Sequence, residues 1–143
     1  MNELNNIEFK RLIIDNIECI KGSIIIDNVE YKSKNLVDFI KNEHNYIFIG
    51  MLENRVIAFL YGYGLSRPDG KSMFYIHSID VLPDYQEKGI GTKLMQYVIN
   101  YIKNEDKYYK MWVLADIDNI RACKLYKKFA NENEQNLYSI ELK

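Results

Sequence analysis

The stretch Gln86–Gly91, QEKGIG, stands between an apolar run at 73–82 and a run at 90–102 whose apolar residues recur with helical spacing. It therefore predicts a strand-to-helix junction with two glycines at the first helical turn. That turn presents unpaired backbone N–H groups and the positive end of the helix dipole, and glycine lets a ligand approach the backbone closely. The stretch is either a plain turn or, with Lys88 adding charge, a binding site for phosphate groups.

Two common phosphate-binding patterns are absent from the sequence. The Walker loop requires G-x-x-x-x-G-K-[ST], and the dinucleotide fingerprint requires G-x-G-x-x-G at the start of a βαβ unit. A G-x-G at the start of a helix is a weak signal by itself, so its meaning depends on the segments around it.

The periodicity of apolar residues outward from this stretch predicts an α/β protein. Apolar runs and alternation predict strands at 7–12, 46–52, 56–65, 73–82, 108–116 and 136–142. Spacing typical of helices predicts helices at 34–42, 90–102 and 119–130. Ser33 is expected to cap the first helix, whereas 15–31 is ambiguous, with Asp15 and Gly22 able to bound a short helix. This order of elements is typical of a mixed α/β sheet.

Length and charge narrow the classes of protein. The 143 residues suit one domain over 1–143, and 48% hydrophobic residues suffice for a core. A net charge of -1 gives no electrostatic reason to expect a nucleic acid or a membrane surface as partner. No apolar run has the length of a membrane span, and two distant cysteines do not make a disulfide framework. We expect a cytoplasmic protein with reduced thiols.

Two segments in order resemble the GCN5-related N-acetyltransferase (GNAT) superfamily. The stretch at 86–91 matches its pattern Gln/Arg-x-x-Gly-x-Gly/Ala, and 119–126 (NIRACKLY) resembles its Asn-x-x-Ala-x-x-Leu-Tyr signature. The resemblance is strongest over 73–130. It implies a GNAT fold, with a mixed, mostly antiparallel central sheet flanked by helices. One departure is Ala130-Asn131, where the family usually has Gly-Phe, and it concerns the path into the last strand.

The resemblance implies that acetyl-CoA is the cosubstrate and that no metal is needed. Its pyrophosphate would lie on the backbone of Glu87, Lys88, Gly89, Ile90, Gly91 and Thr92. Its pantetheine arm would pair, like an added strand, with the backbone of Ile79, Asp80 and Val81. Asn119 matches a residue that contacts the cofactor, and it is also a candidate N-cap of the last helix.

The resemblance also assigns the catalytic role. Tyr126 matches the general acid that protonates the departing thiolate. Some members of the family use a glutamate as base at a position that corresponds here to Leu114, which cannot serve. The base therefore stays open between His77, Asp80, Asp116 and water.

The acceptor predicted from the sequence is a primary amine of a small molecule. Residues 113–129 and 137–142 resemble the aminoglycoside 3-N-acetyltransferase (fortimicin/gentamicin type) branch, but Ser78 stands where that branch has an acid. The alternatives are acetylation of a protein or peptide, and a catalytically degenerate CoA-binding sensor or scaffold. Homodimers are common in the family, so a homodimer is one open possibility for the assembly.

Overall fold

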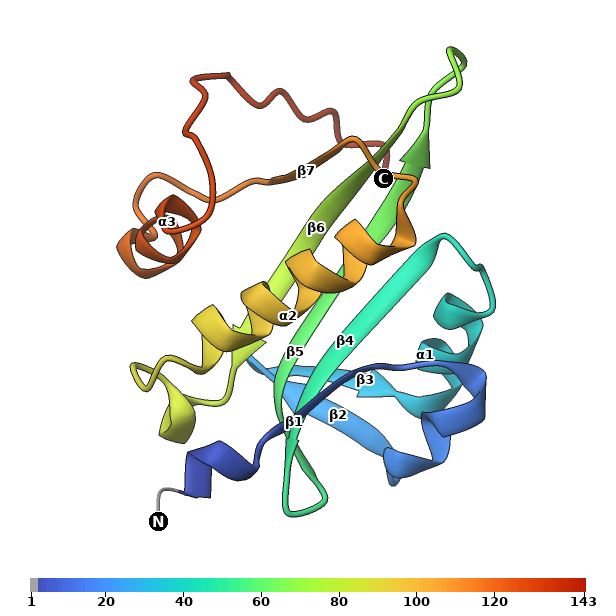
Figure 1. Ribbon diagram of the computed structural model, residues 1–143, viewed down its shortest axis with the longest axis vertical. Helices are drawn as coiled ribbons and strands as arrows, with labels where there is room; N and C mark the ends of the chain where they lie inside the picture. The colour runs from blue at the N-terminus through green and yellow to red at the C-terminus, as the bar shows by residue number, and fades with distance from the viewer. Residues whose placement is uncertain (1–2) are drawn as a thin grey trace.

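The computed structural model describes residues 3–143 and has a five-stranded sheet in the order β1-β4-β5-β6-β7 (Figure 1). The strands of this sheet are β1 (Glu8–Arg11), β4 (Asn45–Leu52), β5 (Arg55–Ser66), β6 (Ser72–Val81) and β7 (Lys110–Val113). Neighbouring strands run antiparallel except β6 and β7, which are parallel. The prediction of a mixed, mostly antiparallel sheet is confirmed.

The helices lie on either side of this sheet or beyond its β7 edge. The α-helices are α1 (Ser33–Ile40), α2 (Ile90–Glu105) and α3 (Ile120–Lys127). The short 3-10 helices are η1 (Glu3–Asn6), η2 (Ile14–Cys19) and η3 (Pro83–Tyr85). Figure 1 shows α2 crossing one face of the sheet diagonally and α3 standing apart at the end of the segment that follows β7.

Each face of the sheet has its own apolar core. On one face, α2 buries a stripe of residues against Phe48, Leu60 and Phe74; the stripe is Ile90, Leu94, Met95, Val98 and Ile102. On the other face, the side chains of α1, η2 and β2 pack against Ile47, Ile49 and Phe59 of the sheet. Burying one large apolar side chain contributes about 1.5–3 kcal/mol, so the buried stripe of α2 holds the helix that follows QEKGIG firmly against the sheet.

A hairpin of β2 (Ser23–Ile26) and β3 (Val29–Lys32) occupies most of the region that is ambiguous in the sequence. Its turn residues Asp27 and Asn28 both have positive φ, which is the geometry that favours tight hairpins. Before the hairpin, Asp15 lies inside η2 and does not cap it. The N-cap is Ile13, whose backbone N–H donates to Asn16 Oδ1 at 2.8 Å.

Two predicted features are wrong in their extent or position. Ser33 is the first residue of α1 and the preceding Lys32 is the N-cap, without a side-chain cap bond. The strand predicted at 108–116 is only the four residues of β7, because the chain leaves β6 after Val113. The departure of the chain from β6 shapes the site described below.

The strand predicted at 136–142 is wrong: the described residues from 130 to the C-terminus form neither strand nor helix. Four apolar side chains in this segment are 78–88% exposed, namely Leu137, Tyr138, Ile140 and Leu142. An alternating pattern makes a strand only where another strand supplies hydrogen bonds and burial. No strand among residues 3–143 pairs with this segment.

The close approach of β6 to β5 at Gly62 leads to a stability prediction. A Cβ at Gly62 would collide with the backbone carbonyl oxygen of Tyr75 and press on the ring of Phe74. We expect Gly62→Ala to lower the free energy of unfolding by about 2 kcal/mol or more, measured by urea denaturation. Gly91→Ala is the matched control, because its Cβ would make an ordinary 3.5 Å contact with Leu125. Equal stability of the two variants would contradict the prediction.

Candidate acyl-CoA site

The QEKGIG stretch forms the loop that leads into α2. Gly89 is the N-cap of α2 with φ 81°, a left-handed conformation that glycine adopts without strain, and no other group lies within 4 Å of where its Cβ would be. Glu87 also has positive φ, 61°. Ile90 is 2% exposed and anchors the helix in the core, so only its backbone is available to a ligand. The loop thus combines a rigidly held helix N-terminus with open space in front of it.

The side chain of Gln86 holds the loop against its neighbours. Its Nε2 donates to the carbonyl oxygen of Val81 at 2.9 Å, and its Oε1 accepts from Nη1 of Arg121 on α3. Gln86 therefore connects the end of β6, the glycine loop and α3, so the two sequence motifs meet in space.

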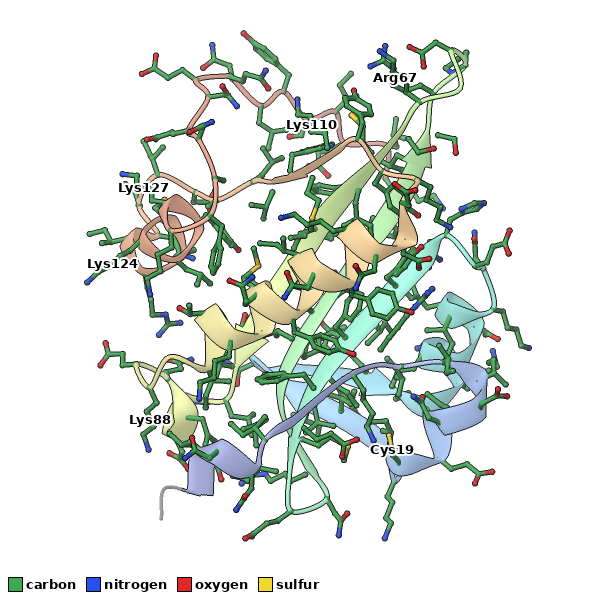
Figure 2. All side chains as sticks on the ribbon, viewed as in Figure 1. Cys19, Arg67, Lys88, Lys110, Lys124 and Lys127 are labelled. Carbon is green, nitrogen blue, oxygen red and sulfur yellow. The ribbon has the colours of Figure 1, made fainter. Side chains whose placement is uncertain are left out.

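A second cation of α3 reaches the first turn of α2. Lys128 Nζ donates to Thr92 Oγ1 at 2.9 Å. Lys88, on the loop itself, is exposed and lies 5.9 Å from the ring of Tyr85. Figure 2 shows Lys88 before α2 and Lys124 on α3 on the same side of the molecule. Arg121 and Lys128 thus bring positive charge to the two ends of the glycine loop, which suits an anionic ligand.

The sequence assigned no role to Arg121 or Lys128. Arg121 is an unspecified position of the second motif, and Lys128 lies beyond it. Their sequence separations from Gln86 and Thr92 are 35 and 36 residues, so no local pattern indicates the contacts.

The far end of β6 has an open backbone edge. The pairing of β6 with β7 runs from Met73 to Ile76, whereas β6 continues to Val81 and stays paired with β5 on its other side. Within residues 3–143, no strand covers the β7 side of β6 beyond Ile76. Ile79, Asp80 and Val81 lie on this stretch, so an extended ligand can add there as a strand does.

Asp80 is half-buried beside this edge. Its Oδ2 accepts a hydrogen bond from Ser78 Oγ at 3.0 Å. Burial raises the pKa of the Asp80 carboxyl above its ordinary value, and the Ser78 bond and the charge of Arg121 oppose part of that rise. Ser78 therefore supports the Asp80 carboxylate with a hydrogen bond, and the carboxylate of this part of the site is that of Asp80.

Tyr126 of α3 is half-buried and packs against the apolar core on the α2 face of the sheet. Burial raises the pKa of its phenol to about 12, and the negative charge of Asp80 contributes to that rise. The hydroxyl is therefore protonated at neutral pH and able to donate a proton.

The remaining predicted residues have identifiable structural roles. Asn119 is the N-cap of α3, and its Oδ1 accepts from the backbone N–H of Ala122 at 3.1 Å. The backbone carbonyl of Asp116 accepts from the N–H of Asn119 at 2.9 Å. The Nδ1 atom of His77 lies 3.1 Å from the hydroxyl of Tyr63, and Leu114 is 48% exposed. Of the candidate bases, Asp80 has the direct electrostatic link to Tyr126.

The cationic shell leads to a binding prediction. We expect Arg121→Ala to weaken CoA binding about 10-fold, or about 1.4 kcal/mol, because a positive charge next to the helix N-terminus is lost. Titration calorimetry at low and high salt measures the effect, which should shrink at high salt.

Two variants control this experiment. Arg121→Lys keeps the charge and should recover part of the affinity. Arg67→Ala removes an arginine at the tip of the β5–β6 hairpin, far from Lys88 in Figure 2, and should bind CoA as the parent protein does. Equal affinities of Arg121→Ala and Arg67→Ala would refute a role for Arg121.

The residues of the site fit CoA. The open edge of β6 suits the pantetheine arm, and the loop at Gly89 with Arg121 and Lys128 suits the phosphates. Among residues 3–143, no three His, Cys, Asp or Glu side chains gather as metal ligands, and no helix is both long and apolar enough to cross a bilayer. The absence of a metal from the reaction stays a prediction.

Comparison with known proteins points to the same family. The family model described as Acetyltransferase (GNAT) family matches residues 16–130. The chain is similar to "Probable N-acetyltransferase san" of Drosophila melanogaster, with 23% identity over 122 residues, 78% of this chain and 66% of that protein. The match thus spans slightly less than two thirds of that relative.

Solved structures share the fold at low sequence identity. The aminoglycoside acetyltransferase meta-AAC0020 from an uncultured soil metagenomic sample, in complex with sisomicin, has a TM-score of 0.76 and 22% identity and covers 98% of this chain and 99% of its own. Aminoglycoside N-acetyltransferase AAC(6')-Iy in complex with CoA has a TM-score of 0.71 and 14% identity, with 95% of each chain covered. Because the family model covers most of the chain and the fold agrees, this protein belongs to the acetyltransferase (GNAT) family.

Proposed function

We propose that this protein transfers the acetyl group of acetyl-CoA directly to a primary amine of a small molecule. The observation that carries the proposal is the meeting of three features in one place. Gln86 of the glycine loop bonds both Val81 at the open edge of β6 and Arg121 of α3, and the charge of Asp80 on that edge acts on the half-buried Tyr126 of α3. Membership of the acetyltransferase family supports the same activity.

Each step of the transfer has a group available for it. Acetyl-CoA supplies an activated thioester. The neutral amine forms the new C–N bond as the C–S bond breaks, and Tyr126 donates its hydroxyl proton to the departing sulfur. An acceptor that arrives as an ammonium group first releases one proton to water, and after the attack the nitrogen loses a second proton, which Asp80 accepts directly or through water. The raised pKa of Asp80 suits that role, because a stronger base abstracts the proton more readily.

A small-molecule acceptor is favoured over a protein because the groups that would face the thioester are side chains of the sheet itself. Asp80, Ser78 and Tyr61 lie within or between the central strands β5 and β6. The aminoglycoside acetyltransferases of the same fold act on small molecules according to their names, which supports the choice. We also propose a cytoplasmic location, supported by the free thiols of Cys19 and Cys123.

The proposal is tested by mixing the protein with acetyl-CoA and a panel of amines and peptides while thiol release is followed. We expect CoA release that depends on a small amine, together with the acetylated amine in the mass spectrum. Acetylation of peptides alone would favour a protein acceptor. Tight binding of CoA without transfer to any member of the panel would favour a sensor or scaffold.

A further inference from the structure

A row of aromatic side chains crosses the sheet surface next to Asp80. We call it the aromatic belt, and its members are Tyr31, Phe39, Tyr61, Tyr63, Tyr75 and His77. Adjacent rings have centroids 5.0–6.3 Å apart, so they form one continuous surface that spans β3, α1, β5 and β6. Five of the six rings are half-buried and that of His77 is exposed, so the belt remains accessible to a ligand.

A β-bulge in β6 creates this surface. Tyr61 pairs with Ser78 and the next residue, Gly62, pairs with Ile76, so His77 is the extra residue between them. Strict alternation would put Tyr75 and Ser78 on opposite faces of the sheet. The bulge brings both to the face that carries Tyr61, and bulges of this kind often re-aim side chains next to active sites.

One end of the belt reaches the reacting groups. Burial, together with the charge of Asp80, raises the pKa of Tyr31, and burial, the neighbouring tyrosines and the charge of Asp80 together raise that of Tyr61 to about 12. The same carboxylate acts on Tyr126. Ser78, which donates to Asp80, is also the residue of β6 that pairs with Tyr61, so Asp80 adjoins the belt and its charge reaches the proton donor as well.

The charges near the belt are few. Two carboxylates, Asp80 and Asp27, act on the described belt tyrosines, and Asp27 is an exposed residue of the β2–β3 turn. A single half-buried carboxylate matches a single ammonium group, whereas a polycation is bound best by several acids. Aromatic rings attract both a cation over their faces and a second ring at 4.5–7 Å between centroids.

From the continuous rings and the half-buried carboxylate of Asp80 beside them, we propose that the belt is the acceptor site and selects a monoamine carried on an aromatic body. This inference rests on the acetyl transfer proposed above. The amino group lies at Asp80, and the ring of the acceptor stacks on Tyr61 and Tyr63 while its amine faces the edge of β6.

The first test compares kcat/KM for four amines: phenethylamine, butylamine, spermidine and kanamycin. We expect phenethylamine to exceed each of the other three at least about 10-fold, because stacking on one or two rings contributes about 1.4 kcal/mol. Equal or higher kcat/KM for kanamycin or spermidine overturns the inference, and so does equality of phenethylamine and butylamine.

The second test uses variants of the belt. Tyr63→Leu and Tyr75→Leu should each raise KM for phenethylamine about 10-fold and leave the Kd of CoA unchanged. Tyr109→Leu is the matched control: Tyr109 is an exposed tyrosine that accepts a hydrogen bond from Arg67, outside the belt. Thermal unfolding of each variant shows whether it is folded. An unchanged KM in both folded belt variants refutes the inference.

These measurements separate this inference from the proposed function. If the parent protein binds CoA and acetylates kanamycin best, acetyl transfer stands and the monoamine acceptor is refuted. If the parent protein neither binds CoA nor acetylates any amine, both are refuted.

Discussion

We expect the Gly89→Val protein to bind CoA at least about 100-fold more weakly than the parent protein in titration calorimetry. The valine side chain would occupy the open space in front of the α2 N-terminus, where the amide hydrogens meet the pyrophosphate. The φ of 81° at Gly89 also disfavours any residue with a Cβ, and a β-branched one most. Both effects act on the loop and leave the core intact.

Gly70→Val is the matched control for this substitution. Gly70 has φ 88° and, like Gly89, nothing within 4 Å of its Cβ position, but it lies in the turn between β5 and β6. Both variants should lose similar stability, of the order of 1–2 kcal/mol, from the left-handed backbone. Only Gly89→Val should lose CoA. If Gly70→Val loses as much affinity, or if Gly89→Val binds normally, the pyrophosphate does not lie on this loop.

The second large effect is expected for Tyr126→Phe, which should lower kcat about 100-fold and leave the Kd of CoA nearly unchanged. The substitution removes only the hydroxyl that protonates the departing sulfur, while the ring still fills its half-buried position on α3. Steady-state kinetics with saturating amine and acetyl-CoA measures the loss. A kcat within about two-fold of the parent value would exclude Tyr126 as the proton donor.

The pH dependence follows from the pKa of about 12 for Tyr126. A phenol with this pKa stays protonated up to about pH 11, so the loss of its proton should not limit kcat at lower pH. Tyr97→Phe is the matched control for the Tyr126→Phe substitution, because Tyr97 is also a half-buried tyrosine on a helix. It packs against Phe9 and Phe48 of the same core. Its kcat should equal that of the parent. An alkaline decline near pH 8 that disappears in Tyr126→Phe would contradict the assignment.

The sequence determined much of the fold because the relevant forces are local. The start of α2 follows from Gly89 and from the apolar spacing after it, and the N-cap of α3 follows from Asn119. The long strands β4 and β5, expected at 46–52 and 56–65, follow from the runs and alternation of apolar residues. Each of these signals is complete within about ten residues of chain.

The predictions failed where a segment depends on a distant partner. A strand at 136–142 has the right apolar pattern, but no partner strand among residues 3–143 supplies its hydrogen bonds. β7 ends at Val113 because β6 and β7 diverge there. No residue near Val113 in the sequence indicates this divergence. A local pattern indicates which residues favour burial, but it does not indicate which strand or helix will pack against them.

For the site, the sequence alone determined the glycine loop, Asn119 and Tyr126 as candidates, through two short motifs. The tertiary structure decided which side chains join them: Arg121 and Lys128 approach the loop from α3, and the bulge at His77 turns Tyr75 toward the face of Asp80. The physical reason is that a helix terminus binds anions through its own backbone, which is local. The charge and aromatic surface around it depend on how distant elements pack and where a strand gains one extra residue.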